Sequence, residues 1–342
     1  MGRREQGIIM LDLEAFRRRP ITHKEAEAIL SLDSIPDELL KTASRVRDRQ
    51  MGREIRLYNP KPRFPSVSVT GASCDLRCKH CGGHYLAGMQ GVDTPSKLKE
   101  FCVKHEANGG VGVLVSGGSD PQGRVPLGRF YGALSWIKEN TGLIVNVHTG
   151  LLDSGQAEEL ASTGVDIVSA DVVGSDETIK RVYGLDAKVE DYAATLWALK
   201  EAQVRNIVPH ICVGLDFGEI RGEARAIKLA SDIEPEIVVI LGLIPTKDTA
   251  MEAVDPPSGE DLAKVVAVSR LMSPDTSIAI GCMRSRIDKE RAEILAIRAG
   301  ADRLVLPTSS TVKAAIAEGF TIKHFDCCCA VPEGLEHLAM RR

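Results

Sequence analysis

Residues 143–170 decide the fold. Leu143-Ile-Val-Asn-Val147 is a short apolar run typical of a strand, residues 153–162 have the spacing of an amphipathic helix, and Asp166-Ile-Val-Ser-Ala170 is a second apolar run entered through a Gly-Val-Asp turn. Two such runs joined through one helix are typical of a β-α-β unit. Its strands lie parallel because the crossover returns the chain to the same end of the sheet.

The same alternation continues in both directions from this unit. Eight units of it predict an α/β fold of the (β/α)₈, TIM-barrel type. Residues 22–50, which start with a capping-box-like Thr22-His-Lys-Glu, read as helical. We therefore expect an N-terminal helical extension at 1–58, the barrel at 59–319 and a cysteine-bearing tail at 320–342. The expected strands are 66–70, 111–115, 143–147, 166–170, 207–213, 237–241, 277–280 and 303–306, and the expected helices include 153–162, 189–202, 222–233, 259–272 and 288–299.

Charge and hydropathy exclude two classes of partner. The formal net charge of −4 over 342 residues gives no electrostatic footprint for nucleic acid. No apolar run approaches the roughly 18–20 residues that span a bilayer. The start, Met1-Gly-Arg-Arg-Glu-Gln6, has mixed charge rather than an apolar signal-peptide core, so we expect a cytoplasmic protein.

Nine cysteines call for an explanation, because a reducing compartment argues against a disulfide framework. Three of them form the run Cys74-Asp-Leu-Arg-Cys78-Lys-His-Cys81. Three thiolates in one loop can bind three irons of a cubane and leave the fourth iron open to a chelating substrate. The loop follows the first expected strand, at the end of the barrel where active sites lie. The alternatives are a zinc knuckle and a purely structural cluster.

Several motifs at successive strand ends resemble the radical S-adenosylmethionine (SAM) superfamily over roughly residues 22–310. The cysteine spacing is the same, and a ring-bearing residue precedes the third cysteine. The resemblance implies a [4Fe–4S] cluster at Cys74, Cys78 and Cys81, and SAM bound beside it. The SAM-binding residues that it implies are His80, Gly117, Gly118, Ser119, His148, Thr149, Asp171, Arg181, Gly214 and Glu219.

Within that superfamily the chain is most similar to the biotin synthase group, which includes the hydrogenase maturases and methylornithine synthase. Biotin synthase binds a sulfur-donating [2Fe–2S] cluster through cysteines of three barrel strands. The corresponding places lie near Val115, at Asn146 and at Val208, and none holds a cysteine. We therefore do not expect biotin synthesis.

A second thiol group is expected from the other end of the chain. Cys282 lies in Gly281-Cys-Met-Arg-Ser-Arg286 at the end of the seventh expected strand, and the tail carries Cys327, Cys328 and Cys329. We expect the tail to fold over the barrel mouth, where Cys282 and at least two tail cysteines bind an auxiliary [4Fe–4S] cluster. The alternative is a surface thiol triplet for redox sensing or zinc.

Three residues beside Cys282 are candidates for catalytic contacts with substrate or cluster, although either arginine could instead be a solvated charge. They are Arg284, Ser285 and Arg286. Of the other inward or isolated groups, we expect His210 to be a structural histidine in the lumen and Cys102 to be a core residue.

The chain also resembles the archaeal-type, two-component lipoyl synthases. That resemblance implies sulfur insertion into an octanoyl chain on a carrier lysine, with sulfur taken from the auxiliary cluster. The partners it implies are reduced ferredoxin or flavodoxin, a paralogous radical SAM chain, and an octanoylated lipoyl domain or H-protein. The alternatives are a non-sulfur enzyme of the hydrogenase maturase or methylornithine synthase type and an Fe–S scaffold protein.

Overall fold

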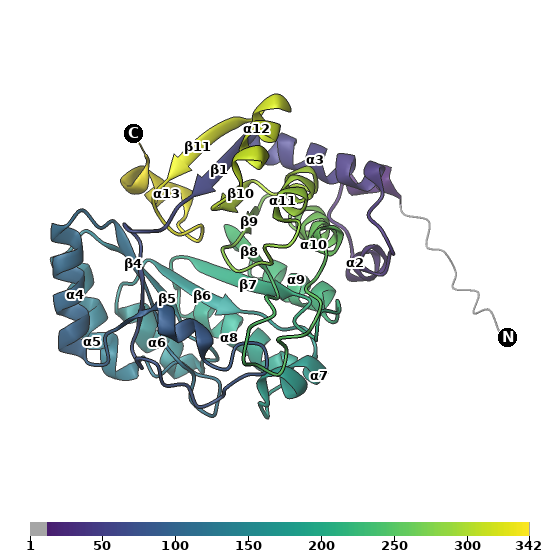
Figure 1. The fold of residues 1–342 in the computed structure, drawn as a ribbon. Coiled ribbons are helices and arrows are strands. Elements are labelled where there is room, and N and C mark those ends of the chain that lie inside the picture. The colour runs from purple at the N-terminus through teal and green to yellow at the C-terminus, as the bar shows by residue number, and fades with distance from the viewer. Residues whose placement is uncertain (1–11, 342) are drawn as a thin grey trace.

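One parallel sheet organises the molecule. The computed structural model describes residues 12–341, and its eleven strands pair in the order β11-β1-β10-β9-β8-β7-β6-β5-β4-β2-β3, each pair parallel (Figure 1). The sheet curves as a half-barrel, with most of the helices on its outer side. The predicted α/β barrel architecture is thereby confirmed as a parallel half-barrel.

All eight predicted strands are present. They are apolar because both faces are covered, by helices outside and by lumen-facing side chains inside. Their bounds are β2 Ser66–Ser68, β4 Gly112–Ser116, β5 Ile144–His148, β6 Ile167–Asp171, β7 Ile207–Val213, β8 Ile237–Gly242, β9 Ser277–Ile280 and β10 Arg303–Val305.

The five helices that the sequence predicted are also present, and several begin at the residue that caps them. Asp153 accepts from the backbone of Gln156, and Ser258 and Asp261 form a capping box at the start of α10. The predicted helices are α6 Ser154–Ser162, α8 Val189–Glu201, α9 Glu223–Asp232, α10 Gly259–Met272 and α11 Lys289–Arg298. The remaining helices are α1 Leu13–Phe16, α2 His23–Leu30, α3 Asp37–Met51, α4 Pro95–Ala107, α5 Tyr131–Asn140, α7 Asp176–Thr178, α12 Ser309–Ala317 and α13 Glu333–Glu336.

Three strands were not predicted. β1 (Glu54–Tyr58) lies inside the segment expected to be helical, and β11 (Thr321–Phe325) lies inside the tail, where it pairs with β1. The third, β3 (Gln90–Gly91), pairs with β2. The boundary expected at residue 58 therefore cuts a strand of the sheet from its neighbours. Within residues 12–341 no strand pairing joins β11 to β3, so the hydrogen-bonded sheet stays open.

Alternating side chains of each strand belong to two different cores, because successive Cβ atoms point to opposite faces. Outward residues such as Val145 and Val168 pack beneath the helices. Inward residues near the strand starts, such as Ile144 and Ile237, pack instead against the tail, including Val331. The tail is thus part of the barrel interior.

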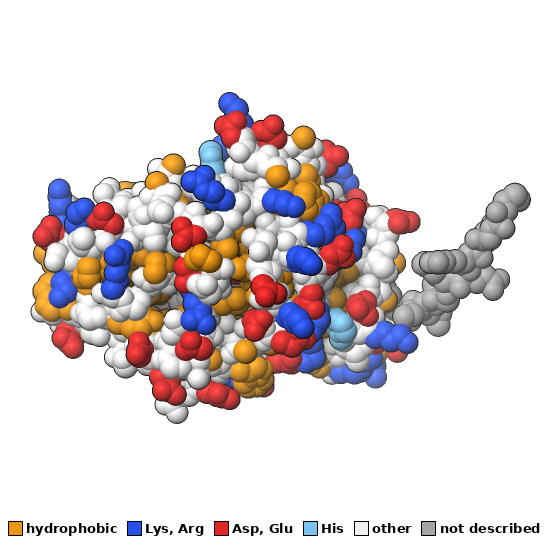
Figure 2. All heavy atoms as spheres, turned by 90° about the horizontal axis from the view of Figure 1, so that it is seen from below, with side chains coloured by type: hydrophobic (Ala, Val, Ile, Leu, Met, Phe, Trp, Pro, Cys, Tyr) orange, Lys and Arg blue, Asp and Glu red, His pale blue; other side chains and the backbone are white. Residues whose placement is uncertain are grey.

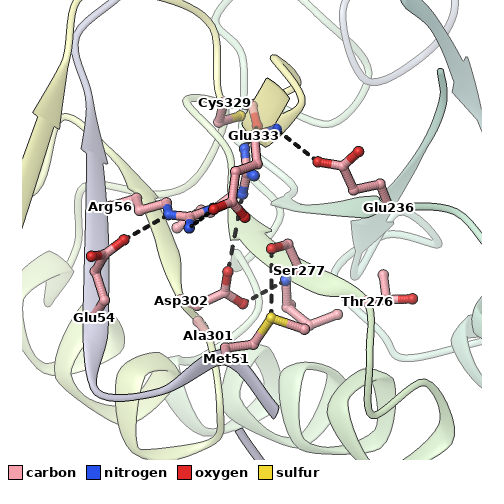
Figure 3. Close-up of polar contacts among 12 residues, drawn as sticks. Met51, Glu54, Arg56, Glu236, Thr276, Ser277, Ala301, Asp302, Cys329 and Glu333 are labelled. Atoms are coloured by element: carbon pink, nitrogen blue, oxygen red, sulfur yellow. Dashed lines mark hydrogen bonds and ion pairs between the residues drawn. The ribbon is translucent and has the colours of Figure 1, made fainter. Parts of the chain in front are cut away.

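The tail does not fold over the barrel mouth as predicted. After β11 the tail packs against inward-facing side chains near the starts of the strands. The Glu333 N–H donates to the carboxylate of Glu236, which lies just before β8, at 2.7 Å (Figure 3). The tail therefore reaches the lumen from the side of the strand starts. Sequence could not give this direction, because it depends on how β11 pairs with β1.

No helix among residues 12–341 is long and apolar enough to cross a bilayer. The charged start Met1–Gln6, on which the expected location rests, lies outside the described residues. On the face drawn in Figure 2, basic and acidic side chains are interspersed, which agrees with the small net charge.

Candidate metal centre and adjoining cleft

The loop between β2 and the short 3₁₀ helix at residues 84–88 carries the first three cysteines. Its turn is tight: the N–H groups of Cys81 and Gly82 both donate to the carbonyl of Cys78, at 3.1 and 2.8 Å. Arg77 adopts a left-handed conformation, with φ of 45°, just before Cys78. The cysteine spacing thus fits a single compact turn.

The glycine turn after β4 holds this loop in place. Asp75 donates its N–H to the carbonyl of Ser119 at 2.9 Å. A Cβ on Gly118 would lie 2.0 Å from the Ser73 carbonyl oxygen and 2.7 Å from the Cβ of Cys74. Glycine is needed there because the cysteine loop itself fills the space. The family resemblance implied that Gly118 contacts SAM; in the structure Gly118 makes room for the cysteine loop.

Two of the three thiols influence each other's ionisation. A hydrogen bond from the Cys78 thiol lowers the pKa of Cys81 to about 4, burial opposes that shift, and the neighbouring His80 adds to it. The same hydrogen bond, with burial, raises the pKa of Cys78. A thiolate is the form that binds metal, so the loop is electrostatically prepared for a cation.

The three cysteines are a donor set that suits an iron–sulfur cubane, because each iron takes one thiolate and three thiolates leave the fourth iron open. Cys74 is near enough for its charge to raise the pKa of Cys78, so all three thiols belong to one loop. Across residues 12–341 no three or more His, Cys, Asp or Glu side chains are arranged around a single metal position. A structural zinc would need a fourth ligand besides these cysteines.

A cleft of about 140 Å³ opens beside Cys78 at the ends of β4, β5 and β6. Four residues predicted to bind SAM line it: Gly117, Ser119, His148 and Asp171. The other lining residues are Leu76, Cys78, Ser116, Gly123, Val125, Gly150, Leu151, Tyr183, Leu185 and Tyr192.

His148 and Asp171 form an ion pair on one wall of the cleft, with Nε2 and Oδ1 3.4 Å apart. Burial raises the pKa of Asp171, but His148 more than offsets it and the pKa falls to about 2. Burial likewise lowers the pKa of His148, and Asp171 reverses the shift. The next ring, His210, lies 5.5 Å away, and burial followed by the charge on His148 lowers its pKa to about 4. His210 faces the lumen and forms a hydrogen bond with the Val208 carbonyl, as expected for a structural histidine.

Two tyrosines that the sequence did not single out complete the cleft. Tyr183 ends a π-helical turn at Ile179–Tyr183, and its ring meets His80 edge-on at 5.4 Å between centroids. Tyr192 comes from α8. The sequence analysis came closest to Tyr183 with Arg181, a predicted SAM contact two residues earlier in the same π-helical turn.

The structure places some predicted SAM contacts outside the cleft lining. Thr149 is fully buried and its hydroxyl donates to the Gly150 carbonyl. Arg181 instead pairs with Asp216 at 3.3 Å and lies over the Phe217 ring.

Two further predicted SAM contacts, Gly214 and Glu219, lie in the segment after β7. Gly214 has φ of +70° and donates its N–H to the buried Glu223 carboxylate at 2.9 Å. Glu219 is exposed and pairs with Arg221 at 3.5 Å. Neither lines the cleft.

Arg284 is structural rather than a contact for substrate. It is buried, its guanidinium pairs with Glu293 and donates to the Val305 carbonyl at 2.8 Å. Ser285 accepts a local bond from Ile287 at 3.1 Å. Arg286 is exposed, and its predicted role stays a prediction.

The tail cysteines are interior residues, so the alternative of a surface triplet is wrong. Cys327 and Cys329 are 0% and 4% exposed, and Cys328 lies with its Sγ 4.0 Å from the side-chain nitrogen of Asn146. A hydrogen bond from the Cys329 thiol lowers the pKa of Cys328 to about 7. Burial and the charge of Cys328 raise the pKa of Cys282. Cys282 is thus within reach of the charge of Cys328, and an auxiliary cluster bound by Cys282 and the tail cysteines stays a prediction.

Of the remaining cysteines, Cys102 is fully buried beside Leu98 in α4, which confirms it as a core residue. Burial raises its pKa to about 12. Cys102 packs in the core beneath the helices and not with either group of thiols, so Cys102→Ala serves below as a matched control.

Comparison with known proteins identifies relatives of the chain. Residues 68–221 match the family model described as Radical SAM superfamily. A biotin synthase of Clostridioides difficile (strain 630) is 26% identical over 287 residues, which cover 80% of this chain and 84% of that protein. A biotin synthase of Synechococcus sp. (strain CC9311) is 27% identical over 297 residues, with 84% and 86% covered.

Two solved structures share the fold. A crystal structure of methylornithine synthase (PylB) superposes with a TM-score of 0.66 at 19% identity, covering 91% of this chain and 96% of that one. The FeFe-hydrogenase maturase HydG from Carboxydothermus hydrogenoformans gives a TM-score of 0.67 at 16% identity, covering 94% and 80%. At these identities the likeness is one of fold.

Proposed function

We propose that this chain, a radical SAM enzyme with biotin synthase-like homologues, inserts sulfur into an unactivated C–H bond of an octanoyl chain carried on a protein lysine. Its radical SAM identity implies a [4Fe–4S] cluster and SAM. The proposal goes further on one observation: the tail thiol Cys328 lies with its Sγ 4.0 Å from Asn146, which is two residues before the cleft residue His148 on β5.

Cys74, Cys78 and Cys81 would hold the cluster, which together with SAM would supply the one-electron chemistry needed to break an unactivated C–H bond. The chain's own residues prepare the site. Gly118 lets the cysteine loop pack closely, and the low pKa of Cys81 favours the ligating thiolate. His148 and Asp171, paired on the wall of the cleft, are placed to orient polar groups of SAM.

β5 links the two sites. His148 lines the cleft, and Asn146, two residues earlier on the same inward face, contacts Cys328. Successive same-face residues of a strand are roughly 6.6 Å apart. An alkyl chain threaded down the lumen would thus pass from the cleft to the tail thiols within a few carbon atoms. That spacing supports hydrogen removal and sulfur addition on one bound chain.

The sulfur source in this proposal is an auxiliary [4Fe–4S] cluster at Cys282 and at least two tail cysteines. The protein's contribution is to hold it in a lumen lined by buried polar side chains and closed by the tail, which limits access of water. Arg286, exposed beside Cys282, stays a candidate for substrate contact.

The partners follow from the same resemblance. We propose reduced ferredoxin or flavodoxin as electron donor, a paralogous radical SAM chain, and an octanoylated lipoyl domain or H-protein as substrate, all in the cytoplasm. Neither nucleic acid nor a membrane is part of this proposal.

The test is product analysis under anaerobic conditions with SAM, dithionite and an octanoylated lipoyl-domain peptide. A mass gain corresponding to sulfur on the peptide supports the proposal, and Cys328→Ala should abolish it while SAM cleavage continues. SAM cleavage without sulfur gain would favour a non-sulfur enzyme of the hydrogenase maturase or methylornithine synthase type. Absence of 5′-deoxyadenosine would point to a scaffold protein.

A further inference from the structure

We infer that His210 accepts a hydrogen bond from the substrate at Nε2, and that the donor is the N–H of the amide that joins the octanoyl chain to its lysine. The inference rests on the proposed function and specifies how the same site recognises its substrate. It follows from the two ring nitrogens, because the backbone already binds one of them and leaves the other open.

The backbone of β7 holds one side of the His210 ring. Nδ1 lies 2.9 Å from the carbonyl oxygen of Val208, two residues earlier on the same strand. A carbonyl oxygen only accepts hydrogen bonds, so Nδ1 carries a proton. In a neutral ring the other nitrogen, Nε2, then has a free lone pair and acts as an acceptor. The bond that makes His210 structural therefore uses only half of the ring.

Nε2 of His210 is open toward the lumen. Val208, on the same face of β7, packs in the inward-facing core, and the ring of His210 lies beside that of the cleft residue His148. Within residues 12–341 the one hydrogen bond of the ring is that of Nδ1. Nε2 is not among the fully buried side-chain atoms that lack a partner, and the residue is half-buried, so Nε2 is accessible. Whatever occupies the lumen beside His148 meets this acceptor.

The surroundings keep the His210 ring uncharged. The centroid of the His148 ring lies 5.5 Å away, and His148 is paired with Asp171, with Nε2 and Oδ1 3.4 Å apart. A positive charge on His148 disfavours a second positive ring beside it. Burial, followed by that charge, lowers the pKa of His210 to about 4. At neutral pH the ring is therefore neutral, and Nε2 is an acceptor rather than a donor.

The neighbouring polar side chains on this wall of the lumen already have partners. Asn146 accepts from the Ser169 hydroxyl at 3.0 Å, and its side-chain nitrogen faces the sulfur of Cys328 at 4.0 Å. The next strand, β8, contributes Val239 and Leu241 to the inward-facing apolar cluster. A ligand here thus meets an apolar surface on one side and an open acceptor on the other, which suits an alkyl chain with one polar link.

A substrate that displaces water from Nε2 has to replace the hydrogen bond that the water made. An acceptor left unpaired in a buried site weakens binding about tenfold to hundredfold. The alkyl part of an octanoyl-lysine chain has no donor, whereas its amide has one N–H. With that N–H at His210, beside the cleft residue His148, the alkyl chain would continue past Asn146 toward Cys328.

The test compares the octanoylated lysine peptide with an ester analogue in which oxygen replaces the side-chain nitrogen of that lysine. The analogue has the same length and shape but lacks the N–H. Binding of each peptide to anaerobically reconstituted protein with SAM is measured by calorimetry, and turnover is measured as kcat/KM. Wild type should prefer the amide by about tenfold to hundredfold, because only the amide satisfies Nε2.

Two substitutions separate the roles of the two ring nitrogens. His210→Asn keeps an NH₂ near the place of Nδ1 for the Val208 carbonyl but has nothing at the place of Nε2. It should weaken binding of the amide and bring the two peptides to about equal affinity. His210→Gln places an amide oxygen near the position of Nε2 and should keep part of the preference. The control is His324→Asn on β11, where an exposed histidine is changed, and its preference should equal that of wild type.

The outcomes separate this inference from the proposed function. Equal binding of amide and ester by wild type, or a full amide preference in His210→Asn, would overturn the role of His210. A wild-type protein that does not bind the amide peptide would overturn that role and the proposed function together. An amide preference that depends on His210, without sulfur gain, would support the role of His210 and remove only sulfur insertion. The first comparison uses wild-type protein alone, so it decides the question even if a variant does not fold.

Discussion

Gly118 shows how much one absent methyl group decides. Its Cβ would overlap the Ser73 carbonyl and the Cys74 side chain, and neither can move without shifting the cysteine loop. Forcing a group into such a space typically costs about 1–3 kcal/mol. Gly118→Ala should therefore lower cluster occupancy severalfold and SAM cleavage with it, measured as iron content and 5′-deoxyadenosine.

The matched control is Gly132→Ala in α5, where nothing lies within 4 Å of the added atom. Alanine favours a helix over glycine, so this variant should keep full iron content and gain slight stability. Equal iron content in the two variants would contradict the packing role of Gly118.

Glu223 makes stability depend on pH. It is 4% exposed, one carboxylate oxygen has no hydrogen-bond partner, and burial raises its pKa from 4.5 to about 7. An acid with a raised folded-state pKa binds its proton more tightly when folded. Its contribution is therefore full below the unfolded pKa and is lost as pH rises through 7.

Between pH 5 and pH 8 this group should cost the wild type about 2–3 kcal/mol of unfolding free energy. Glu223→Gln keeps the acceptor for the Gly214 N–H and does not titrate, so the difference between the two proteins should be about 1 kcal/mol at pH 5 and grow by about 2–3 kcal/mol toward pH 8. Urea unfolding at both pH values measures it. Parallel pH profiles for the two proteins would show that Glu223 ionises normally.

Sequence located the chemistry-bearing residues better than it located their orientation. Spacing singled out Cys74 and Cys78, the family resemblance singled out His148 and Asp171, and the structure places Cys78, His148 and Asp171 in the lining of one cleft. Arg284 was misread because its buried partner, Glu293, lies on α11 and only tertiary packing brings the two together.

At the scale of elements, the central strands were predictable because they are continuous apolar runs buried on both faces. β1 and β11 were missed because charged residues alternate with apolar ones in Glu54-Ile-Arg-Leu-Tyr58 and Thr321-Ile-Lys-His-Phe325. That alternation is itself the pattern of a half-exposed strand, so a stricter use of period two would have found them.

The tail is held by ion pairs as well as by apolar packing. Glu336, 4% exposed, accepts from the Tyr58 hydroxyl and pairs with Arg303 at 3.0 Å and with Arg56 at 3.7 Å. Removing one partner of a buried pair typically costs about 3–5 kcal/mol, because the remaining charge is uncompensated. Glu336→Gln should lower the melting temperature and speed amide hydrogen exchange across residues 327–341.

Glu333→Gln is the matched control in the same helix. Its side chain is 69% exposed and pairs with Arg56 at 3.0 Å (Figure 3), and exposed pairs contribute about 0–1 kcal/mol. The backbone bond from Glu333 to Glu236 is unaffected by this change. Equal exchange rates in both variants would argue against Glu336 as the anchor of the tail.

At the scale of the whole molecule, one lumen connects two groups of thiols that lie about 250 residues apart in sequence. The cysteine loop and its cleft lie at the strand ends, and the tail enters from the strand starts. Sequence predicted both groups of thiols. It did not predict the open edge between β11 and β3 or the side from which the tail enters, since both depend on strand pairing between distant segments.

The most direct measurement is SAM-dependent release of 5′-deoxyadenosine from anaerobic protein reduced with dithionite, together with its metal content. Wild type and Cys102→Ala should contain iron and release the nucleoside, whereas Cys81→Ala should release at least a hundredfold less. Zinc in the Cys74–Cys81 loop, or release that does not depend on Cys81, would contradict a cluster held there by three thiolates.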